Sequence, residues 1–300
     1  MIARLDHLRT HPDVFRHLTG LSVTAFDALA AELVPVLDAA HRAALARPDR
    51  QRAVGGGDTF DLGTADHLLL TVMWLRQYPT NEVLGFLFGV SDSTASRTRT
   101  RVLPHLERAG RDTMRMPDPG SGRRKTLPKL LADTPGLAVV IDSFEPRTHR
   151  PKRRQKAYDS GKKKAHTLKS QVAVNEESGR VVDVSDSVPG RWADIKRLKT
   201  SRVLKRLPAG VGALGDSGYQ GIADLHAGGA CPRKKPRGKE RPPADRKYNR
   251  AFSRRRIVVE HTIGRLRRFR AVAEVNRHGR TGHAMRVRAI AGLVNRMIDG

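Results

Sequence analysis

The stretch Leu137-Ala-Val-Val-Ile-Asp142 decides the fold, because five apolar residues typical of a buried strand run directly into an acidic side chain. Two more acids follow apolar runs in the same way: Asp216 after residues 211–215, and Glu260 after residues 257–259. Carboxylate oxygens are the ligands that Mg²⁺ prefers, and a bound cation offsets the repulsion that would otherwise raise a carboxyl pKa. The three acids therefore predict a divalent-metal site.

The charge of the chain predicts the kind of partner that this site meets. The sequence has 57 Lys and Arg against 30 Asp and Glu, a formal net charge of +27. Residues 1–100 carry 10 basic and 11 acidic side chains, whereas residues 101–300 carry 47 basic and 19 acidic ones. A field of this sign and size favours phosphate polyanions. We therefore expect the polyanion to bind mainly the last two thirds of the chain.

Composition limits the remaining classes of protein. With 300 residues and 38% hydrophobic content, the chain is long enough for two domains with ordinary cores. A single cysteine, Cys231, excludes an intrachain disulfide or a thiolate metal cluster and fits a reducing compartment. No apolar stretch approaches the length of a membrane span. We expect a soluble, cytoplasmic, nucleoid-associated protein with no membrane partner.

The first hundred residues are expected to be helical. Apolar residues recur at three- and four-residue steps over residues 22–45, with Ser22 as the N-cap and Pro35 as a kink or break. After the Gly55-Gly-Gly57 break, Thr64 can cap a second apolar helix that ends near Tyr78-Pro79.

A helix-turn-helix pattern closes this region. A short helix over residues 80–88 precedes a tight turn at Gly89-Val90 and a Ser-, Thr- and Arg-rich helix over residues 91–106. On that last helix, Arg97 is the candidate for contacting DNA bases or phosphates. A plain helical bundle with a solvated arginine face fits the same spacing, because helix-turn-helix signatures are weak and this region is nearly neutral.

The remaining two hundred residues have an α/β pattern. Residues 111–135 form a linker rich in Gly, Pro and Arg that includes Arg123-Arg-Lys125. Strands are expected over residues 137–141, 167–174 and 180–188, and the last two form an antiparallel hairpin around the turn Asn175-Glu-Glu-Ser-Gly179. Four further elements are expected: a helix over 192–207, a strand over 211–214, a short helix over 221–227, and the last clear helix over 245–269.

This order of elements is that of a ribonuclease H-like fold, a mixed sheet flanked by helices. In that fold the first acid lies on the first strand, the second just after the fourth, and the third on a later helix that faces them. The sequence therefore predicts an all-α helix-turn-helix domain at residues 1–110 and a ribonuclease H-like catalytic domain at residues 136–300.

The ordered acids favour one chemistry. An aspartate after a strand is by itself structural more often than catalytic, since strands end in turns. Three acids in this order fit phosphodiester displacement, in which two Mg²⁺ ions about 3.5–4 Å apart bind the attacking and leaving oxygens and the acids bind the metals. The 12 histidines show no paired zinc spacing, and Gly55-Gly-Gly57 lacks the Gly-Lys-Ser/Thr that completes a phosphate loop.

Four stretches carry a resemblance to a known family: Tyr158-Asp-Ser-Gly-Lys-Lys-Lys-Ala-His-Thr-Leu-Lys169, Val188-Pro-Gly-Arg191, Gly215-Asp-Ser-Gly-Tyr-Gln-Gly221 and Arg256-Ile-Val-Val-Glu-His261. They resemble a DDE-type transposase of bacterial insertion sequences, in particular the insertion sequence five family. The resemblance covers nearly the whole chain, including the helical N-terminal region.

The resemblance implies roles for individual residues. Asp142, Asp216 and Glu260 match the family's catalytic, metal-binding triad. Arg256 and Arg267 match its basic partners. Their spacing of four and seven residues from Glu260 puts them on adjoining parts of one helix face, where they would bind DNA phosphates; generic surface charge is the alternative.

Further DNA contacts are expected near these positions, at Lys162, Lys163, Lys164, His166 and Tyr219. For the lysines a solvated run fits equally, and for Tyr219 a packing role is as plausible as stacking on a base or ribose. Three positions depart from the family pattern: Ser143 and Ser253, and Arg267 where the family has lysine. None of these departures removes a metal ligand.

The function implied is that of a transposase. It would use two Mg²⁺ ions, with Mn²⁺ as a substitute, to cleave double-stranded DNA at terminal inverted repeats and join it to target DNA, as a homodimer assembled on DNA. Two alternatives fit the same residues: a DNA-binding protein of transposase descent without activity, and an endonuclease that lacks strand transfer.

Overall fold

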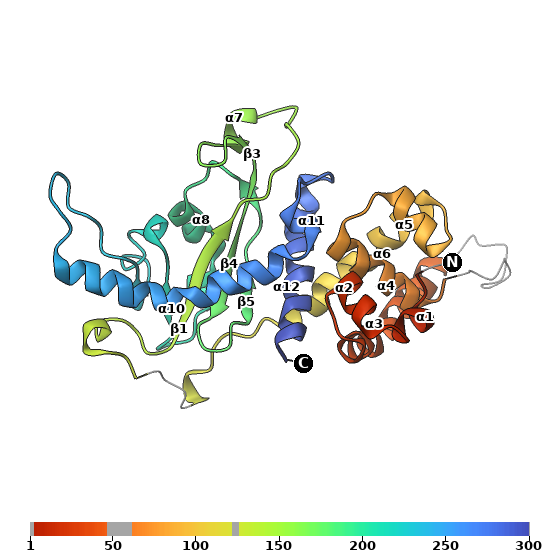
Figure 1. The fold of residues 1–300 in the computed structure, drawn as a ribbon, viewed down its shortest axis with the longest axis horizontal. Helices are drawn as coiled ribbons and strands as arrows, with labels where there is room; N and C mark the ends of the chain where they lie inside the picture. Colours follow the sequence, from red (N-terminus) through yellow and green to blue (C-terminus); the bar gives the residue numbers. More distant parts are fainter. Residues whose placement is uncertain (1–2, 47–61, 122–125, 300) are drawn as a thin grey trace. The chain divides into compact units, whose positions relative to one another are not determined.

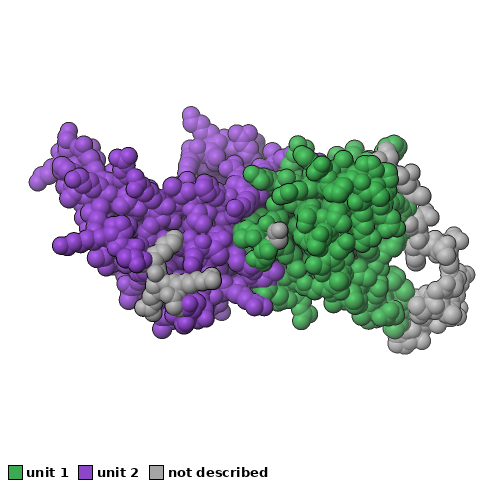
Figure 2. Space-filling view, turned by 60° about the horizontal axis from the view of Figure 1, so that its bottom comes forward, with its two compact units in different colours: residues 1–112, 268–271, 288–300 green, residues 113–267, 272–287 purple. Residues whose placement is uncertain are grey.

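The computed structural model describes residues 3–46, 62–121 and 126–299. It divides into two compact units (Figure 2). Unit 1 comprises residues 1–112, 268–271 and 288–300, and unit 2 comprises residues 113–267 and 272–287. The expected helical domain thus gains two short C-terminal segments that the sequence assigned to the catalytic domain. The Gly55-Gly-Gly57 break and the basic Arg123-Arg-Lys125 lie outside the described residues.

Unit 1 is helical. Its N-terminal helices are α1 (Leu5–Arg9), α2 (Pro12–Thr19), α3 (Val23–Leu45), α4 (Thr64–Gln77), α5 (Asn81–Phe88) and α6 (Asp92–Asp112). The Ser22 hydroxyl caps α3 by accepting a hydrogen bond from the Ala25 N–H at 3.1 Å, as predicted. Helix α3 is not divided at Pro35. Thr64 is the first residue of α4, and Gly63 takes the capping position expected for it.

The turn between α5 and α6 explains two glycines of the helix-turn-helix. Gly89 ends α5 with φ of 68°, a left-handed conformation that favours glycine. The Gly85 carbonyl accepts a hydrogen bond from the Val90 N–H at 2.9 Å. A Cβ at Gly85 would lie 2.5 Å from the Val90 carbonyl oxygen, closer than real contacts allow. The sequence G-x-x-x-G over residues 85–89 therefore lets the two helices meet closely.

Unit 2 is built on one mixed sheet. Its strands are β1 (Ala138–Phe144), β4 (Leu168–Asn175), β5 (Val181–Val184), β6 (Val188–Pro189), β7 (Gly212–Leu214) and β8 (Gly229–Ala230). The strand order is β5-β4-β1-β7-β8, with β6 also pairing with β4. Strands β4 and β5 form the predicted antiparallel hairpin, and β7 runs parallel to β1. A separate small sheet pairs β2 (Asp159–Ser160) with β3 (Ala165–His166).

The remaining helices are α7 (Gln155–Tyr158), α8 (Asp194–Ser201), α9 (Val203–Arg206), α10 (Pro243–Arg267), α11 (Arg270–Ala273) and α12 (His283–Asp299), with short 3₁₀ turns η1 (Pro119–Ser121), η2 (Lys129–Leu131), η3 (Ser217–Tyr219) and η4 (Arg280–Gly282). Of these, α8 and α10 pack against the sheet, and residues 288–299 of α12 belong to unit 1. The long helix α10 crosses the sheet beside β1 and β4 (Figure 1). One hydrophobic core cluster joins Ile141, Ala173 and Ala213 of the sheet to Leu198 of α8. Together with unit 1, this is the predicted α/β class with an all-α N-terminal region.

A buried ion pair fixes α10 to the sheet. The Arg255 guanidinium donates to both Glu176 carboxylate oxygens, at 2.9 and 2.5 Å. It also donates to Thr134 Oγ1 and to the Pro135 carbonyl, each at 2.7 Å. Both side chains of the pair are more than nine-tenths buried. Because Glu176 follows β4, this contact sets where α10 lies over the sheet.

Three predicted helices differ from the structure. The helix expected over residues 192–207 is two short helices, because Arg202 adopts a left-handed φ of 61° between them. Residues 221–227 form turns, and the local helical turn lies earlier, at η3. The helix expected to be the last is followed by α12, whose Val287, Ile290, Leu293 and Val294 have helical spacing and are buried.

Candidate active site

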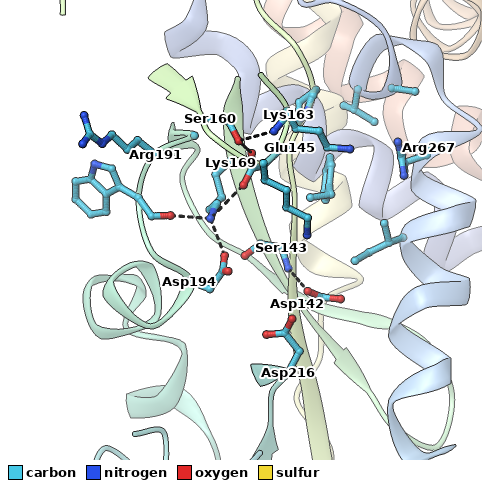
Figure 3. Close-up of a pocket in the computed structure, with 18 of the residues that line it drawn as sticks. Asp142, Ser143, Glu145, Ser160, Lys163, Lys169, Arg191, Asp194, Asp216 and Arg267 are labelled. Atoms are coloured by element: carbon cyan, nitrogen blue, oxygen red, sulfur yellow. Dashed lines mark hydrogen bonds and ion pairs between the residues drawn. The ribbon is translucent and has the colours of Figure 1, made fainter. Parts of the chain in front are cut away.

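A cavity of about 560 Å³ in unit 2 brings the three predicted acids together on its lining. Asp142 lies on β1, Asp216 follows β7, and Glu260 is on α10. Figure 3 shows Asp142 and Asp216 facing the same space, with Lys169 and Asp194 beside them. Both the sheet and α10 thus contribute to the lining of the site.

Strand register explains why the two aspartates are neighbours. Strands β1 and β7 are parallel, and Val140 pairs with Leu214. Asp142, still within β1, and Asp216, just past the end of β7, each lie two residues further along, so the register puts them at the same level of the sheet. Sequence order alone indicated that the acids belong together, and the parallel pairing supplies the geometry.

The environment of Asp142 favours its protonated form. Burial, followed by the charges of Asp216 and Asp194, raises its pKa to about 6. The Ser143 N–H, which donates to Asp142 Oδ1 at 2.7 Å, and the Arg256 guanidinium, 3.6 Å from Oδ2, act in the opposite direction. A divalent cation would relieve the same repulsion, so the acid pair fits such a ligand in charge and in donor type.

Asp216 is held by a local turn. Its Oδ1 accepts a hydrogen bond from the Gly218 N–H at 2.8 Å, which caps η3. A Cβ at Gly218 would lie 2.8 Å from Asp194 Oδ2 and 3.0 Å from Asp216 Oδ1. Position 218 therefore requires glycine, because any side chain there would collide with the carboxylates of Asp194 and Asp216.

Glu260 takes a different position from the two aspartates. It is exposed on α10 and reaches the shared cavity from the helix side. Within residues 3–46, 62–121 and 126–299, no three His, Cys, Asp or Glu side chains gather closely enough to hold one metal ion. The structure therefore brings two of the three predicted ligands together and places the third on the facing wall.

A buried lysine network beside the acids was not found from the sequence. Lys169 Nζ lies 2.9 Å from Asp194 Oδ1 and 3.2 Å from Glu145 Oε1, and it donates to the Trp192 carbonyl at 2.6 Å (Figure 3). The carboxylates raise the pKa of Lys169 although burial, the largest single influence, lowers it. A lysine near the start of a strand that is buried on both faces was the available signal.

The predicted basic contacts are distributed unevenly. Lys162, Lys163 and Arg267 line the acid cavity. Lys164 is exposed in the adjoining β2–β3 turn, and His166 is half-buried on β3. Arg256 is directed to Asp142. Arg97, in unit 1, is exposed on α6, where its Nε donates to the Ser93 carbonyl one helical turn earlier.

The DNA-stacking role considered for Tyr219 is wrong for this structure. Its side chain is 0% exposed. Its hydroxyl hydrogen-bonds with Ser143 Oγ at 2.9 Å and accepts from Gln171 Nε2 at 3.1 Å. Because the ring packs against Gly215, where an added Cβ would lie 2.7 Å from the ring atom Cγ, Tyr219 supports the loop that carries Asp216.

Comparisons with known proteins show the family of this chain. Residues 141–295 match the family model described as DDE superfamily endonuclease, and residues 60–112 match the helix-turn-helix of DDE superfamily endonuclease. The chain belongs to the DDE superfamily of endonucleases and is an enzyme of the DDE-type insertion-sequence transposases. It is 34% identical over 236 residues to the probable transposase for insertion sequence element IS702 of Microchaete diplosiphon, which covers 77% of this chain and 79% of that protein. No solved structure matches.

Family membership identifies several of the expected properties. The helix-turn-helix and endonuclease domains make DNA the partner, and this family generally uses divalent metal ions. The mixed sheet flanked by helices is the ribonuclease H-like fold expected from the order of elements. Among the described helices none is by itself long and apolar enough to cross a membrane, although the bent pair α2 and α3 reaches the length and composition together.

Proposed function

We propose that this protein cleaves DNA at the terminal inverted repeats of its insertion sequence and joins the freed ends to target DNA. The observation that supports this most strongly is the β1–β7 register, which presents Asp142 and Asp216 at one level of a cavity that Glu260 also lines. Such a cavity matches an in-line displacement at phosphorus, which needs no covalent protein nucleophile.

Asp142 and Asp216 would hold the metal ions, and Glu260 would be the third ligand, from α10. When bound, two Mg²⁺ ions, or Mn²⁺ in their place, supply Lewis-acid stabilisation of the attacking and leaving oxygens. Lys162, Lys163 and Arg267 would bind the phosphates on either side of the scissile bond, because they are exposed cations on the lining, as is Arg191.

The reaction runs in two balanced steps. Water attacks the phosphodiester at the element end, which breaks one P–O bond and leaves a 3′-hydroxyl and a 5′-phosphate. The 3′-hydroxyl then attacks a target phosphodiester, forms a new P–O bond and releases a target 3′-hydroxyl. Because each step exchanges one phosphodiester oxygen for another, no oxidant or nucleotide is required.

Unit 1 would recognise the terminal repeats. The Arg97 side chain is exposed on α6, the second helix of the helix-turn-helix. In this type of motif the second helix lies in the major groove of DNA. Lys164 and His166 would contact the backbone beside the active site. Two ends must be brought together for joining, so we propose a homodimer assembled on DNA, acting in the cytoplasm at the nucleoid.

Supercoiled DNA that carries the element's ends tests this function. Wild-type protein should produce Mg²⁺-dependent cleaved and joined products, and Asp142→Ala, Asp216→Ala and Glu260→Ala should each abolish both. The matched control is Glu177→Ala, which removes an exposed acid from the β4–β5 turn. Nicking without joining would identify a nuclease without strand transfer. Tight binding with no metal-dependent product would identify an inactive DNA-binding protein, and either result would overturn the proposal.

A second readout does not depend on turnover. Mg²⁺ should raise the melting temperature of the wild-type protein, because a ligand that binds only the folded state stabilises it. Asp142→Ala and Asp216→Ala should lose this metal-dependent increase, whereas Glu177→Ala should retain it.

A further inference from the structure

A second cavity in unit 2 is lined by cations and has no acidic residue on its described lining. Its volume is about 460 Å³. The side chains that give it its character are Arg150, Arg277, Arg280, His149, His278 and Tyr158. The cavity of the active site, in contrast, is lined by five Asp and Glu residues together with its cations. A concave site with only cationic and neutral groups is suited to an anion.

The loop of residues 276–281, which supplies most of these cations, is anchored by the buried Asn276. Asn276 is 2% exposed, and its backbone N–H donates to the Arg147 carbonyl at 2.8 Å. Its side-chain Nδ2 donates to the His278 carbonyl at 2.7 Å, and its Oδ1 accepts from Arg286 Nη2 at 2.5 Å. Arg286 is itself 4% exposed. The 276–281 loop is therefore fixed in place before any ligand binds.

Two of the arginines are positioned without being neutralised. The Arg280 guanidinium stacks over the Tyr158 ring, 5.1 Å from its centroid. Arg150 Nε donates to the neutral Gln155 Oε1 at 3.0 Å. Within the described residues neither forms an ion pair with an acid. Their positive charge therefore remains available to bind an anion. Stacking on Tyr158 orients the Arg280 guanidinium, and the N–H groups on its edge can donate to a phosphate.

The two cavities lie on either side of one thin wall. Successive residues of β4 line different cavities: Leu168 lines the cationic one and Lys169 lines the active site. On the partner strand β6, Val188 and Pro189 both line the cationic cavity, and Gly190, directly after the strand, lines the active site. Successive strand residues point to opposite faces, so the paired β4 and β6 ends form the wall.

The segment after β1 extends along both sides of this wall. Thr148, His149 and Arg150 line the cationic cavity, whereas residues 160–163 of the same segment line the active site. A DNA strand held by Lys162 and Lys163 therefore has a second cationic site next to it along the chain's own surface. A polymer with regularly spaced phosphates can occupy both sites at once, which a single small anion cannot.

We propose that this second cavity binds the phosphodiester backbone of the DNA outside the scissile phosphate, with Arg150 and Arg280 as its phosphate ligands. The inference rests on the proposed function, because it assigns the cavity to the same DNA molecule. The cavity would fix the direction in which DNA leaves the active site.

Phosphate-ethylation interference with a DNA fragment of the element's end tests this assignment. Binding is measured in Ca²⁺, so that no turnover is needed. Wild-type protein should show sensitive phosphates at the cleavage site and a second, separate group. Arg280→Gln and Arg150→Gln should lose the second group only, weaken binding roughly tenfold each, and lower the salt-dependence slope by about one.

The matched control is Arg153→Gln, which removes the same charge three residues from Arg150 at an exposed position on neither lining. It should leave the second group of phosphates intact. An equal loss in Arg153→Gln would show that only general charge matters and would overturn the assignment. The assignment would also be overturned if Arg280→Gln and Arg150→Gln fold with wild-type melting temperatures and keep the wild-type footprint.

The two proposals fail differently. If wild-type protein cleaves and joins DNA but the cavity variants keep the wild-type footprint, the cavity assignment is wrong and the transposase function stands. If wild-type protein shows no sensitive phosphates at the element's end at all, the proposed function itself is contradicted.

Discussion

Arg256 Nη2 lies 3.6 Å from Asp142 Oδ2, so an ion pair joins α10 to the acid on β1. Arg256 Nε is buried and has no hydrogen-bond partner within the described residues. Its neighbour Arg255 is fully engaged with Glu176 instead. Two adjacent arginines of one helix thus face different environments, Arg256 beside Asp142 and Arg255 in the buried pair with Glu176.

Arg256→Gln should slow DNA cleavage about 10- to 100-fold without lowering the melting temperature, because it removes the cation paired with Asp142. Arg256 lowers the pKa of Asp142, so its loss should raise that pKa further. The acid limb of the pH–rate profile should therefore move to higher pH. Arg254→Gln, at an exposed position two residues before Arg256 on α10, is the control. Equal slowing by both variants would contradict a specific role.

Arg255→Gln, in contrast, should lower the stability of the protein. It leaves the Glu176 carboxylate buried and without its cation, which costs about 3–5 kcal/mol of stability. The free energy of unfolding in urea should fall by this amount. If Arg255→Gln unfolds at the same urea concentration as wild type, the buried pair does not fix α10 to the sheet.

His283 should make the protein sensitive to acid. Burial, followed by the charge of Arg286, lowers its pKa to about 3, and Ser187 Oγ hydrogen-bonds its Nδ1 at 2.8 Å. Between pH 6.5 and about 3 the unfolded chain binds a proton at this position that the folded chain does not, so stability falls as pH falls.

The melting temperature of wild type should therefore drop more steeply than that of His283→Asn between pH 7.5 and 5. Some acid sensitivity will remain in both proteins, because burial and Arg101 also lower the pKa of His67, to about 4. Parallel curves for the two proteins would show that His283 does not contribute.

Gly85→Ala should disrupt the helix-turn-helix, because its Cβ would lie 2.5 Å from the Val90 carbonyl oxygen. We expect weaker binding to the element's ends and a lower melting temperature. Gly63→Ala is the matched change, since its Cβ would meet only Asp66 Oδ2, at 3.9 Å. Similar losses in the two variants would argue against a specific need for glycine in this turn.

Local patterns predicted much of the fold. The apolar run before Asp142, the β4–β5 hairpin and the α5–α6 turn each depend on neighbouring residues, and each was found as expected. The left-handed break at Arg202 has no such signal, because arginine rarely adopts that conformation.

The candidate site was only partly accessible to sequence reasoning. The order of the acids indicated one site, but the Lys169, Glu145 and Asp194 network joins three elements that only tertiary packing brings together. Tyr219 was assigned to DNA because it follows Asp216, yet burial under Gly215 is a property of the folded loop. Spacing shows which residues are neighbours in sequence, not which way their side chains point.

The most direct test of the account concerns Glu260, because it lines the active-site cavity apart from the two aspartates. The measurement is the single-turnover rate of Mg²⁺-dependent cleavage at the element's end, for wild type, Glu260→Gln and Glu177→Gln. We predict that Glu260→Gln retains the wild-type melting temperature and DNA affinity but loses cleavage, while Glu177→Gln cleaves normally. Cleavage at the wild-type rate by Glu260→Gln would contradict a three-acid active site.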